Sequence, residues 1–263
     1  MHTEQVYQKK AHPQKAYPDV GIVIPTYNEI ANIKNLLETL LTIMPKATIM
    51  IVDDNSPDRT WEHVAAYSNR YKNIVLVKQQ KKTGLGNAYK RGFTEILKYP
   101  IEKIVQLDAD FSHPLTSIPK LVTLADQYDV IIGSRYKQGV SVINWELSRI
   151  LISYAGNTFA RLISQLPIHD LTSGFKCYRR DALAAISMSA LRSQGYAFQI
   201  EMNVVLHKLG FTLYEHPIIF TNRQQGLSKL DTRILREAFL LSLTFPFYST
   251  DKHKKKSAPK NNT

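Results

Sequence analysis

Residues 20–54 read VGIVIPTYNEIANIKNLLETLLTIMPKATIMIVDD, and the hydrophobic period of this stretch changes twice. Residues 21–24 are a short apolar run of the kind that forms a buried strand. Between residues 30 and 44 the apolar side chains recur at helical spacing, and Pro45 ends that pattern. Residues 49–52 repeat the short apolar run. The stretch therefore predicts a strand, an amphipathic helix and a second strand.

The same alternation continues along the first half of the chain. Helical patterns follow at 61–68, 88–98 and 118–125, and strand patterns follow at 74–77, 103–107 and 130–132. Strands that alternate with helices pair in parallel, because a parallel crossover needs a connection of about a dozen residues, usually a helix. We therefore expect residues up to about 135 to form one open layer of an α/β protein, a Rossmann-like, doubly wound and mostly parallel sheet with helices on both faces.

The pattern changes in the second half of the chain. We expect a long, weakly amphipathic helix over 145–166, a loop over 169–174, a short strand, helices near 181–186 and 199–209, a strand pair (211–214 and 218–220) bent at Pro217, and a last helix over 233–247. The expected organisation is a disordered N-terminal arm (1–19), a single folded domain (20–248) that ends in an interfacial helix at about 231–248, and a basic disordered tail (249–263).

Composition limits the classes of protein that the chain can belong to. Hydrophobic residues make up 44% and charged residues 21%, which is ordinary globular usage and excludes disorder throughout. Lys and Arg exceed Asp and Glu by 12, so nucleic acid, anionic membrane and phosphorylated substrates are all open as partners. The single cysteine, Cys177, cannot form an internal disulfide, so a cytoplasmic location is expected. No apolar window approaches the ~20 residues that a membrane-spanning helix needs.

Polar side chains follow four of the predicted strands at the point where each strand ends. The segments are 25–29 (PTYNE), 53–56 (DDNS), 108–110 (DAD) and 133–135 (GSR). Ligands of open parallel sheets bind beyond the carboxyl ends of the strands, where loops and helix N-termini converge. We therefore expect the acids and the arginine to gather at one edge of the sheet and to form the functional site.

Asp108 and Asp110 are the strongest local signal at this edge. Alternate residues just past a strand can turn two carboxylates toward one hard cation, which can in turn hold a diphosphate. The structural alternative is an Asx turn that caps the helix beginning near Pro114. The acids at 53–54 have a structural alternative too, because they could cap the helix that begins near Ser56.

Eight segments occur in one order along residues 20–241. They are Pro25-Thr26-Tyr27-Asn28-Glu29, Asp53-Asp54-x-Ser56-x-Asp58-x-Thr60, Gly84-Leu85-Gly86, Asp108-Ala109-Asp110 with His113-Pro114, GSRY at 133–136, DLTSGF at 170–175, GYAFQIEM at 195–202, and Arg223-x-x-Gly226-x-Ser228-Lys229-Leu230. In this order they resemble family 2 glycosyltransferases of the GT-A fold, and they are most similar to dolichol-phosphate (polyprenyl-phosphate) mannosyltransferases.

The resemblance implies a role for each matching residue. The donor nucleotide would contact Pro25, Tyr27, Glu29, Asp54, Asp108, Ala109, Arg223 and Lys229, and Mg²⁺ or Mn²⁺ on its diphosphate would be held by Asp108, Asp110 and Ser112. The catalytic residues would be Asp110, Arg135, Arg149 and Ser153, of which the last three lie where the family binds the phosphate of its lipid acceptor. Two residues depart from the family pattern: Arg59 stands where glycine is usual, and Ser112 replaces a glutamine that is a further metal ligand in some members.

The resemblance also implies a reaction, the inverting transfer of mannose from GDP-mannose to polyprenyl (dolichyl) phosphate to give a β-linked lipid phosphosugar. A phosphate monoester has a second pKa of about 6 and is mostly dianionic at neutral pH, so this acceptor needs positioning rather than a general base. Arg135 and Arg149 could supply that positioning. Asp170 would be the base only for a hydroxyl acceptor, so Asp170→Asn is expected to keep substantial activity.

Three alternatives stay open: a polyprenyl-phosphate glucosyltransferase or other family 2 enzyme with a hydroxyl acceptor, a basic nucleic-acid-binding protein, and a catalytically inactive scaffold, against which the presence of both Asp108 and Asp110 argues. The acidic edge of the sheet would repel a phosphate backbone, so no nucleic-acid partner is expected. The C-terminal helical elements are expected on the acceptor side. The apolar faces of 145–166 and 233–248 suit peripheral association with a membrane surface, with a membrane-anchored subunit as a further partner; for 145–166, core packing is the alternative.

Overall fold

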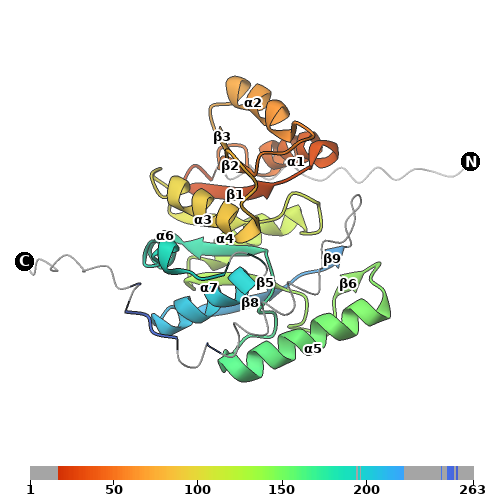
Figure 1. Cartoon of the computed structure of the whole chain (residues 1–263), viewed down its shortest axis with the longest axis vertical. Helices are drawn as coiled ribbons and strands as arrows, with labels where there is room; N and C mark the ends of the chain where they lie inside the picture. The colour runs from red at the N-terminus through yellow and green to blue at the C-terminus, as the bar shows by residue number, and fades with distance from the viewer. Residues whose placement is uncertain are drawn as a thin grey trace, which may run out of the picture.

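The computed structural model describes residues 17–193, 195, 197–221, 244, 248–251 and 253. Its centre is a seven-stranded sheet with the strand order β3-β2-β1-β4-β7-β5-β8, and β6 and β9 form a separate two-stranded sheet (Figure 1). All pairs in the larger sheet are parallel except the two that β7 makes with β4 and β5.

Strands and helices alternate along the first part of the chain, as the hydrophobic period predicts. The strands are β1 (Val20–Thr26), β2 (Thr48–Asp53), β3 (Ile74–Lys78), β4 (Lys103–Gln106), β5 (Val130–Ser134), β6 (Val142–Ile143), β7 (Lys176–Arg179), β8 (Leu213–Pro217) and β9 (Phe220–Thr221). The α-helices are α1 (Ile30–Ile43), α2 (Thr60–Arg70), α3 (Leu85–Ile96), α4 (Ile118–Leu124), α5 (Leu147–Ser164), α6 (Arg180–Ala184) and α7 (Ala197–Lys208). The predicted long helix is α5.

Side chains of the central strands alternate between two hydrophobic clusters, one on each face of the sheet. On β2, Met50 and Val52 belong to the cluster formed with α3, α6 and α7. Ile49 and Ile51 belong to the cluster formed with α1, α2 and α4. A strand shows this alternation when helices cover both faces of its sheet. The predicted doubly wound α/β fold is therefore confirmed.

The sheet is not complete within residues up to about 135, and this expectation of one self-contained layer is wrong. Strand β7 lies between β4 and β5 and is antiparallel to both, with Cys177 opposite Val105 on one side and Ile131 on the other. Because β4 and β5 are joined only through β7, the second half of the chain supplies an internal strand. It also supplies an edge strand, since β8 pairs in parallel with β5.

The two strands around Pro217 do not pair with each other as a bent pair. Pro217 is the last residue of β8, which lies against β5, whereas Phe220 and Thr221 pair in parallel with β6. The change of direction after Pro217 therefore moves the chain from the large sheet to the small one. Apart from residue 244, the predicted last helix (233–247) lies outside the described residues, as does nearly all of the arm and tail.

Candidate active site

The loops that follow β1 and β2 are joined by side chains that cap backbone N–H groups. Asn28 N–H donates to Ser56 Oγ (3.0 Å), and Glu29 N–H donates to Thr60 Oγ1 (3.0 Å). Asp53 is fully buried and accepts hydrogen bonds from the Thr26 hydroxyl and from the Ser56 backbone (both 2.8 Å). Asp53 therefore has a structural role, but it is not the expected helix cap, because α2 begins at Thr60 and Asp53 bonds the loop before it.

Asp54 holds the segment that leads into α3. Its carboxylate accepts hydrogen bonds from Thr83 N–H (2.7 Å), Gly84 N–H (2.8 Å) and the Gln79 amide (2.9 Å). Gly84 has φ of 93°, a backbone conformation that favours glycine. The segment brings Lys82 to the predicted nucleotide residue Tyr27, with Lys82 Nζ 3.8 Å from the centroid of its ring. Asp54 thus shapes the predicted donor side through this segment.

The aspartate pair lies directly beyond β4, where the sequence places it. Asp108 Oδ1 accepts a hydrogen bond from the Tyr89 hydroxyl of α3 (2.8 Å), and the Asp108 side chain is 25% exposed. Burial, followed by the charge of Asp108, raises the pKa of Tyr89 well above its usual value, so the phenol stays a donor. Asp110 is buried and accepts from the backbone and hydroxyl of Ser112 (3.1 and 2.6 Å).

The neutral ring of His113 fixes the backbone of this turn. Its Nδ1 accepts a hydrogen bond from Asp108 N–H (3.1 Å), and the ring stacks on Phe175 at a centroid distance of 5.1 Å. Burial lowers the pKa of His113, which keeps Nδ1 available as an acceptor. The sequence marked this residue only through the His113-Pro114 segment of the resemblance, and that segment gave it no role.

The donor set around Asp108 and Asp110 fits a hard divalent cation bound together with phosphate. The described part of the chain contains no group of three or more His, Cys, Asp or Glu side chains that could hold a metal. Two carboxylates with a neighbouring hydroxyl, Ser112, are oxygen ligands of the type that Mg²⁺ and Mn²⁺ prefer, and substrate phosphates commonly complete such a set. A Cβ placed on Gly174 would lie 3.3 Å from Asp108 Oδ2, so glycine keeps the space beside this carboxylate open.

Arg135 follows β5 and is held by a buried carboxylate from the loop before β7. Its Nε donates to Asp170 Oδ2 and its Nη2 to Asp170 Oδ1, both at 2.7 Å, and Nη2 also donates to Thr172 Oγ1 (2.7 Å). Asp170 is fully buried and Arg135 is 8% exposed. The sequence analysis considered Asp170 only as a base for a hydroxyl acceptor, and this bidentate ion pair gives it a different, structural role. Its main effect is to fix the plane of the guanidinium.

Arg149 and Ser153 project from α5 toward the same region. Arg149 Cζ lies 4.1 Å and Arg135 Cζ 5.7 Å from the centroid of the Trp145 ring, so the two cations share one aromatic side chain. Ser153 Oγ accepts a hydrogen bond from the Tyr136 hydroxyl (2.8 Å). The structure therefore brings the three predicted acceptor-side residues together.

A buried asparagine docks α5 onto this region, and the sequence did not reveal it. Asn157 is 2% exposed; its Oδ1 accepts from Leu171 N–H (3.0 Å), and its Nδ2 donates to Thr172 Oγ1 (3.1 Å). These bonds connect the helix of Arg149 to the loop of Asp170. The signal available in the sequence was spacing, because Arg149, Ser153 and Asn157 recur every four residues of the predicted helix and so share one face.

The remaining predicted residues divide into two groups. Pro25, Tyr27, Glu29 and Ala109 lie on β1 or in the loops after β1 and β4, at the expected edge. Arg223 and Lys229 lie outside the described residues, as does most of the interfacial helix predicted at 231–248. Within the described ranges no helix has the length and hydropathy needed to cross a bilayer.

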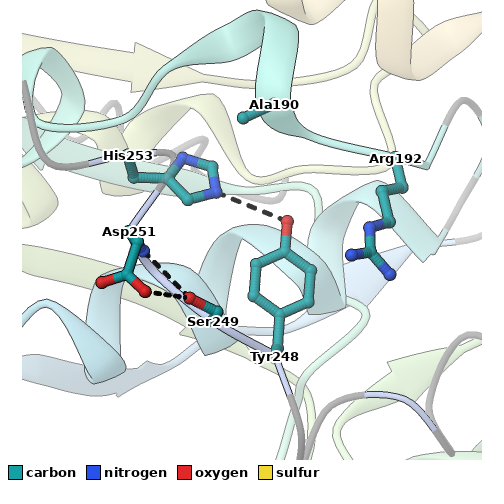
Figure 2. A pocket seen from close by; sticks show the side chains of 6 residues that line it. All are labelled: Ala190, Arg192, Tyr248, Ser249, Asp251 and His253. Atoms are coloured by element: carbon teal, nitrogen blue, oxygen red, sulfur yellow. Dashed lines mark hydrogen bonds between the residues drawn. The ribbon is translucent and has the colours of Figure 1, made fainter.

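A separate cavity of about 220 Å³ is lined by residues that were not predicted for the site (Figure 2). The residues are Ala190, Arg192, Tyr248, Ser249, Asp251 and His253. The Tyr248 hydroxyl donates to Glu201 Oε1 of α7 (2.7 Å), and Lys208 Nζ donates to Tyr248 O (3.0 Å). These contacts attach the C-terminal part of the described chain to α7.

Comparison with solved structures identifies the fold as that of GT-A glycosyltransferases. Glucosyl-3-phosphoglycerate synthase from Mycobacterium tuberculosis, in complex with Mn²⁺, UDP-glucose and phosphoglyceric acid, gives a TM-score of 0.62 at 17% identity over 86% of this chain and 78% of that chain. The complex of the same enzyme with Mn²⁺, UDP-glucose and glycerol 3-phosphate gives 0.63 at 16% identity over 91% and 86%. At sequence identities as low as 16–17%, the similarity to these structures shows the fold alone.

The chain belongs to glycosyl transferase family 2, whose family model matches residues 21–187. It is 37% identical over 216 residues to the undecaprenyl-phosphate mannosyltransferase of Micrococcus luteus, covering 82% of this chain and 89% of that protein. It is also 37% identical over 222 residues to the polyprenol monophosphomannose synthase of Mycolicibacterium smegmatis, covering 82% and 83%. Family membership favours a transferase over the nucleic-acid-binding alternative.

Proposed function

We propose that this family 2 glycosyltransferase transfers mannose from GDP-mannose to the phosphate of a polyprenyl phosphate with inversion at the sugar. The observation that carries the proposal is the pair of arginines, Arg135 and Arg149, that share the ring of Trp145 at the carboxyl edge of the sheet. Guanidinium groups suit a phosphate dianion, because each carries a positive charge and planar N–H donors, although Asp170 and Thr172 already accept three of the five donors of Arg135. The names of the two relatives, a mannosyltransferase and a monophosphomannose synthase, support the same acceptor and sugar.

In this mechanism the chain positions an acceptor that is already a nucleophile. A phosphate oxygen of the lipid attacks the anomeric carbon, the bond from that carbon to the diphosphate oxygen breaks, and GDP leaves with the electron pair. Arg135, oriented by Asp170, and Arg149 hold the attacking phosphate in line with the leaving group. The dianion has no proton to lose, so no side chain acts as a general base.

The donor side neutralises the charge that develops on the leaving diphosphate. Asp108 and Asp110 would hold Mg²⁺ or Mn²⁺ there, and the cation when bound would stabilise the diphosphate as it departs. Tyr89 and His113 keep Asp108 in place through its side chain and its backbone. Arg223 and Lys229 are proposed to add positive charge at the diphosphate, and Tyr27 with Lys82 is proposed to line the nucleotide site.

The outer face of α5 is proposed to lie on the membrane surface from which the lipid acceptor is taken. This face exposes large apolar side chains: Leu147 (70%), Leu151 (60%), Ile152 (59%), Tyr154 (52%) and Leu162 (72%). A contiguous exposed apolar face marks an interaction surface. The basic residues of the same helix, Arg149 and Arg161, favour anionic lipid headgroups. Arg149 and Ser153 lie on the same helix, so this arrangement would place the acceptor phosphate beside them. Peripheral membrane association at a cytoplasmic surface follows from the proposal.

Transfer from labelled donor tests the proposed reaction. We expect label from GDP-mannose, and not from UDP-glucose, to enter the lipid extract when polyprenyl phosphate and Mn²⁺ are present, with a β-anomeric product by NMR. Asp110→Ala should lower this transfer at least ~100-fold, whereas Asp126→Asn, at an exposed position, should not. Incorporation from UDP-glucose alone would support the glucosyltransferase alternative and would exclude mannose as the sugar.

Vesicle sedimentation tests the membrane surface separately. Wild-type protein should sediment with vesicles that contain an anionic lipid, and the double variant Leu147→Glu/Leu151→Glu should sediment at least ~10-fold less. Tyr99→Glu changes an exposed aromatic residue outside α5 and serves as the matched control. Equal sedimentation of the three proteins would contradict a bilayer contact through α5 and would leave this face for a membrane-anchored subunit.

A further inference from the structure

Phe220 lies in a two-residue strand that connects two loops of the site. Phe220 N–H donates to Ser141 O (3.0 Å), in the loop that follows β5, and Thr221 N–H donates to Ser112 O (3.2 Å), in the loop that follows β4. Ser112 in turn donates its hydroxyl to Asp110 (2.6 Å). The backbone of β9 therefore holds the aspartate loop and the arginine loop at a fixed separation.

The side chain of Phe220 also links the donor side of the site to the acceptor side. It meets the ring of His113 edge-on at a centroid distance of 5.6 Å, and it meets the ring of Trp145 edge-on at 5.5 Å. His113 accepts the backbone N–H of Asp108, and Trp145 carries Arg149 on its face at 4.1 Å. One half-buried ring thus packs between the residue that fixes the donor-side turn and the residue that supports the acceptor-side cation.

A third contact reaches the other acceptor-side arginine. Arg135 Cζ lies 5.4 Å from the centroid of the Phe220 ring. This carbon belongs to the guanidinium that Asp170 orients. In Figure 1, β9 lies beside β6, close to the amino end of α5. In-line transfer is sensitive to such an arrangement, because a displacement of about 1 Å between reacting groups can lower a rate by ~100-fold.

We propose that Phe220 is a positioning residue that sets the distance between the donor diphosphate and the acceptor phosphate. This inference rests on the proposed function, because it takes Asp108 and Asp110 as the donor side and the two arginines as the acceptor side. Phe220 acts through His113 and Trp145 rather than on the reacting atoms. Its removal should therefore leave each half of the site able to bind while the two halves lose their alignment.

Kinetics of Phe220→Leu test this prediction, because leucine keeps an apolar side chain but removes the ring. We expect kcat for mannose transfer to fall about 10- to 100-fold. The Kd for GDP with Mn²⁺ and the KM for polyprenyl phosphate should each stay within about threefold of wild type, since neither half-site loses a ligand. Phe220→Tyr, which retains the ring, should recover kcat to within about threefold.

Tyr214→Leu is the matched control for loss of an aromatic contact. Tyr214 stacks on Tyr128 at 4.3 Å and lies on β8 near the amino end of β5, away from the arginine loop. The Tyr214→Leu variant should show a lower Tm, as Phe220→Leu should, but an unchanged kcat. If Phe220→Leu melts below the assay temperature, Phe220→Met takes its place.

Two results would overturn the role of Phe220 while leaving the proposed function intact. The first is a Phe220→Leu variant with wild-type kcat. The second is a parallel loss of GDP affinity and kcat, which would mean that the ring only supports the aspartate loop. Absence of mannose transfer by the wild-type protein would instead refute the proposed function, so the two failures are distinguishable.

Discussion

Asp170 binds the guanidinium of Arg135 through both carboxylate oxygens, with Nε–Oδ2 and Nη2–Oδ1 distances of 2.7 Å. The same carboxylate also accepts Arg135 N–H (2.9 Å), and the Asp170 backbone donates to Glu215 (2.9 Å). This buried ion pair changes the expectation for Asp170→Asn. A phosphate acceptor still needs no base, but it needs Arg135 in a fixed orientation.

We therefore predict that Asp170→Asn impairs acceptor use more than donor binding. Removing one charge of a buried pair leaves the other uncompensated, which costs about 3–5 kcal/mol of stability. The KM for polyprenyl phosphate should rise at least ~10-fold in steady-state assays, while calorimetry should give a GDP affinity close to that of wild type. A variant with unchanged acceptor KM would show that the orientation of Arg135 does not matter for catalysis.

Gly174→Ala should weaken metal-dependent nucleotide binding. The added Cβ would lie 3.3 Å from Asp108 Oδ2, a tight contact that crowds the predicted metal ligand, and 3.5 Å from His113 Cε1, an ordinary van der Waals distance. We expect GDP affinity in Mn²⁺ to fall about 3- to 10-fold, and affinity in EDTA to stay unchanged. Gly156→Ala, where the Cβ would meet nothing within 4 Å, is the control and should leave both affinities as they are.

Lys176 should make stability depend on pH. Burial lowers the pKa of this fully buried lysine to about 7, while an unfolded chain keeps it near 10.4. Between these values the unfolded state binds one proton more than the folded state, so stability rises with pH and the gain is lost as pH falls to 7. Protonation in the folded state is disfavoured although Lys176 Nζ donates to Gln199 O (3.0 Å) and Asn203 Oδ1 (2.9 Å).

Urea unfolding between pH 7 and 8 measures this dependence. The free energy of unfolding of wild type should rise with pH, with a slope of up to ~1 kcal/mol per pH unit. Cys177 opposes the rise increasingly above this range, because its thiol ionises in the unfolded chain with a pKa of about 8.5 whereas burial raises its folded pKa to about 12. Lys176→Met should abolish the slope and Lys120→Met, at an exposed position, should keep it; equal slopes in all three proteins would refute the prediction.

Arg59→Gly should stabilise the fold. Arg59 precedes α2 with φ of 63° and ψ of 28°, a left-handed conformation that costs a residue with a Cβ about 1 kcal/mol. The Arg59–Glu62 contact (3.8 Å) is exposed and compensates little. Thermal unfolding should show a gain of about 0.5–1 kcal/mol for glycine, with part of the relief offset by its greater freedom when unfolded. Arg59→Ala keeps the Cβ and should show no gain.

The periodic elements of the first half could be predicted because each carries its own signal. The run at 49–52 alternates between two clusters, and its apolar content alone marks a strand covered on both faces. Strand β7 could not be placed in the same way. Its four residues, KCYR, have too few apolar positions to define a period, and nothing local determines that Cys177 lies between Val105 and Ile131.

The candidate site shows the same division between local and long-range information. Asp108 and Asp110 follow a predicted strand directly, so the edge on which they lie could be inferred from the parallel topology. The partners of those residues are distant in sequence: Arg135 and Asp170 are 35 residues apart, and Tyr89 is 19 from Asp108. Such contacts depend on which strands and loops become neighbours, and a hydrophobic period carries no information about that.

The position of β7 also governs the order in which the protein can be completed during synthesis. When the ribosome has released β4, the side of that strand away from β1 still lacks its neighbour, and β5 has no partner in the nascent sheet. Both gaps close only after the segment Lys176–Arg179 has emerged. Until then the growing chain presents an unprotected edge of buried-type residues, the state in which nascent proteins are most prone to aggregate and to engage chaperones.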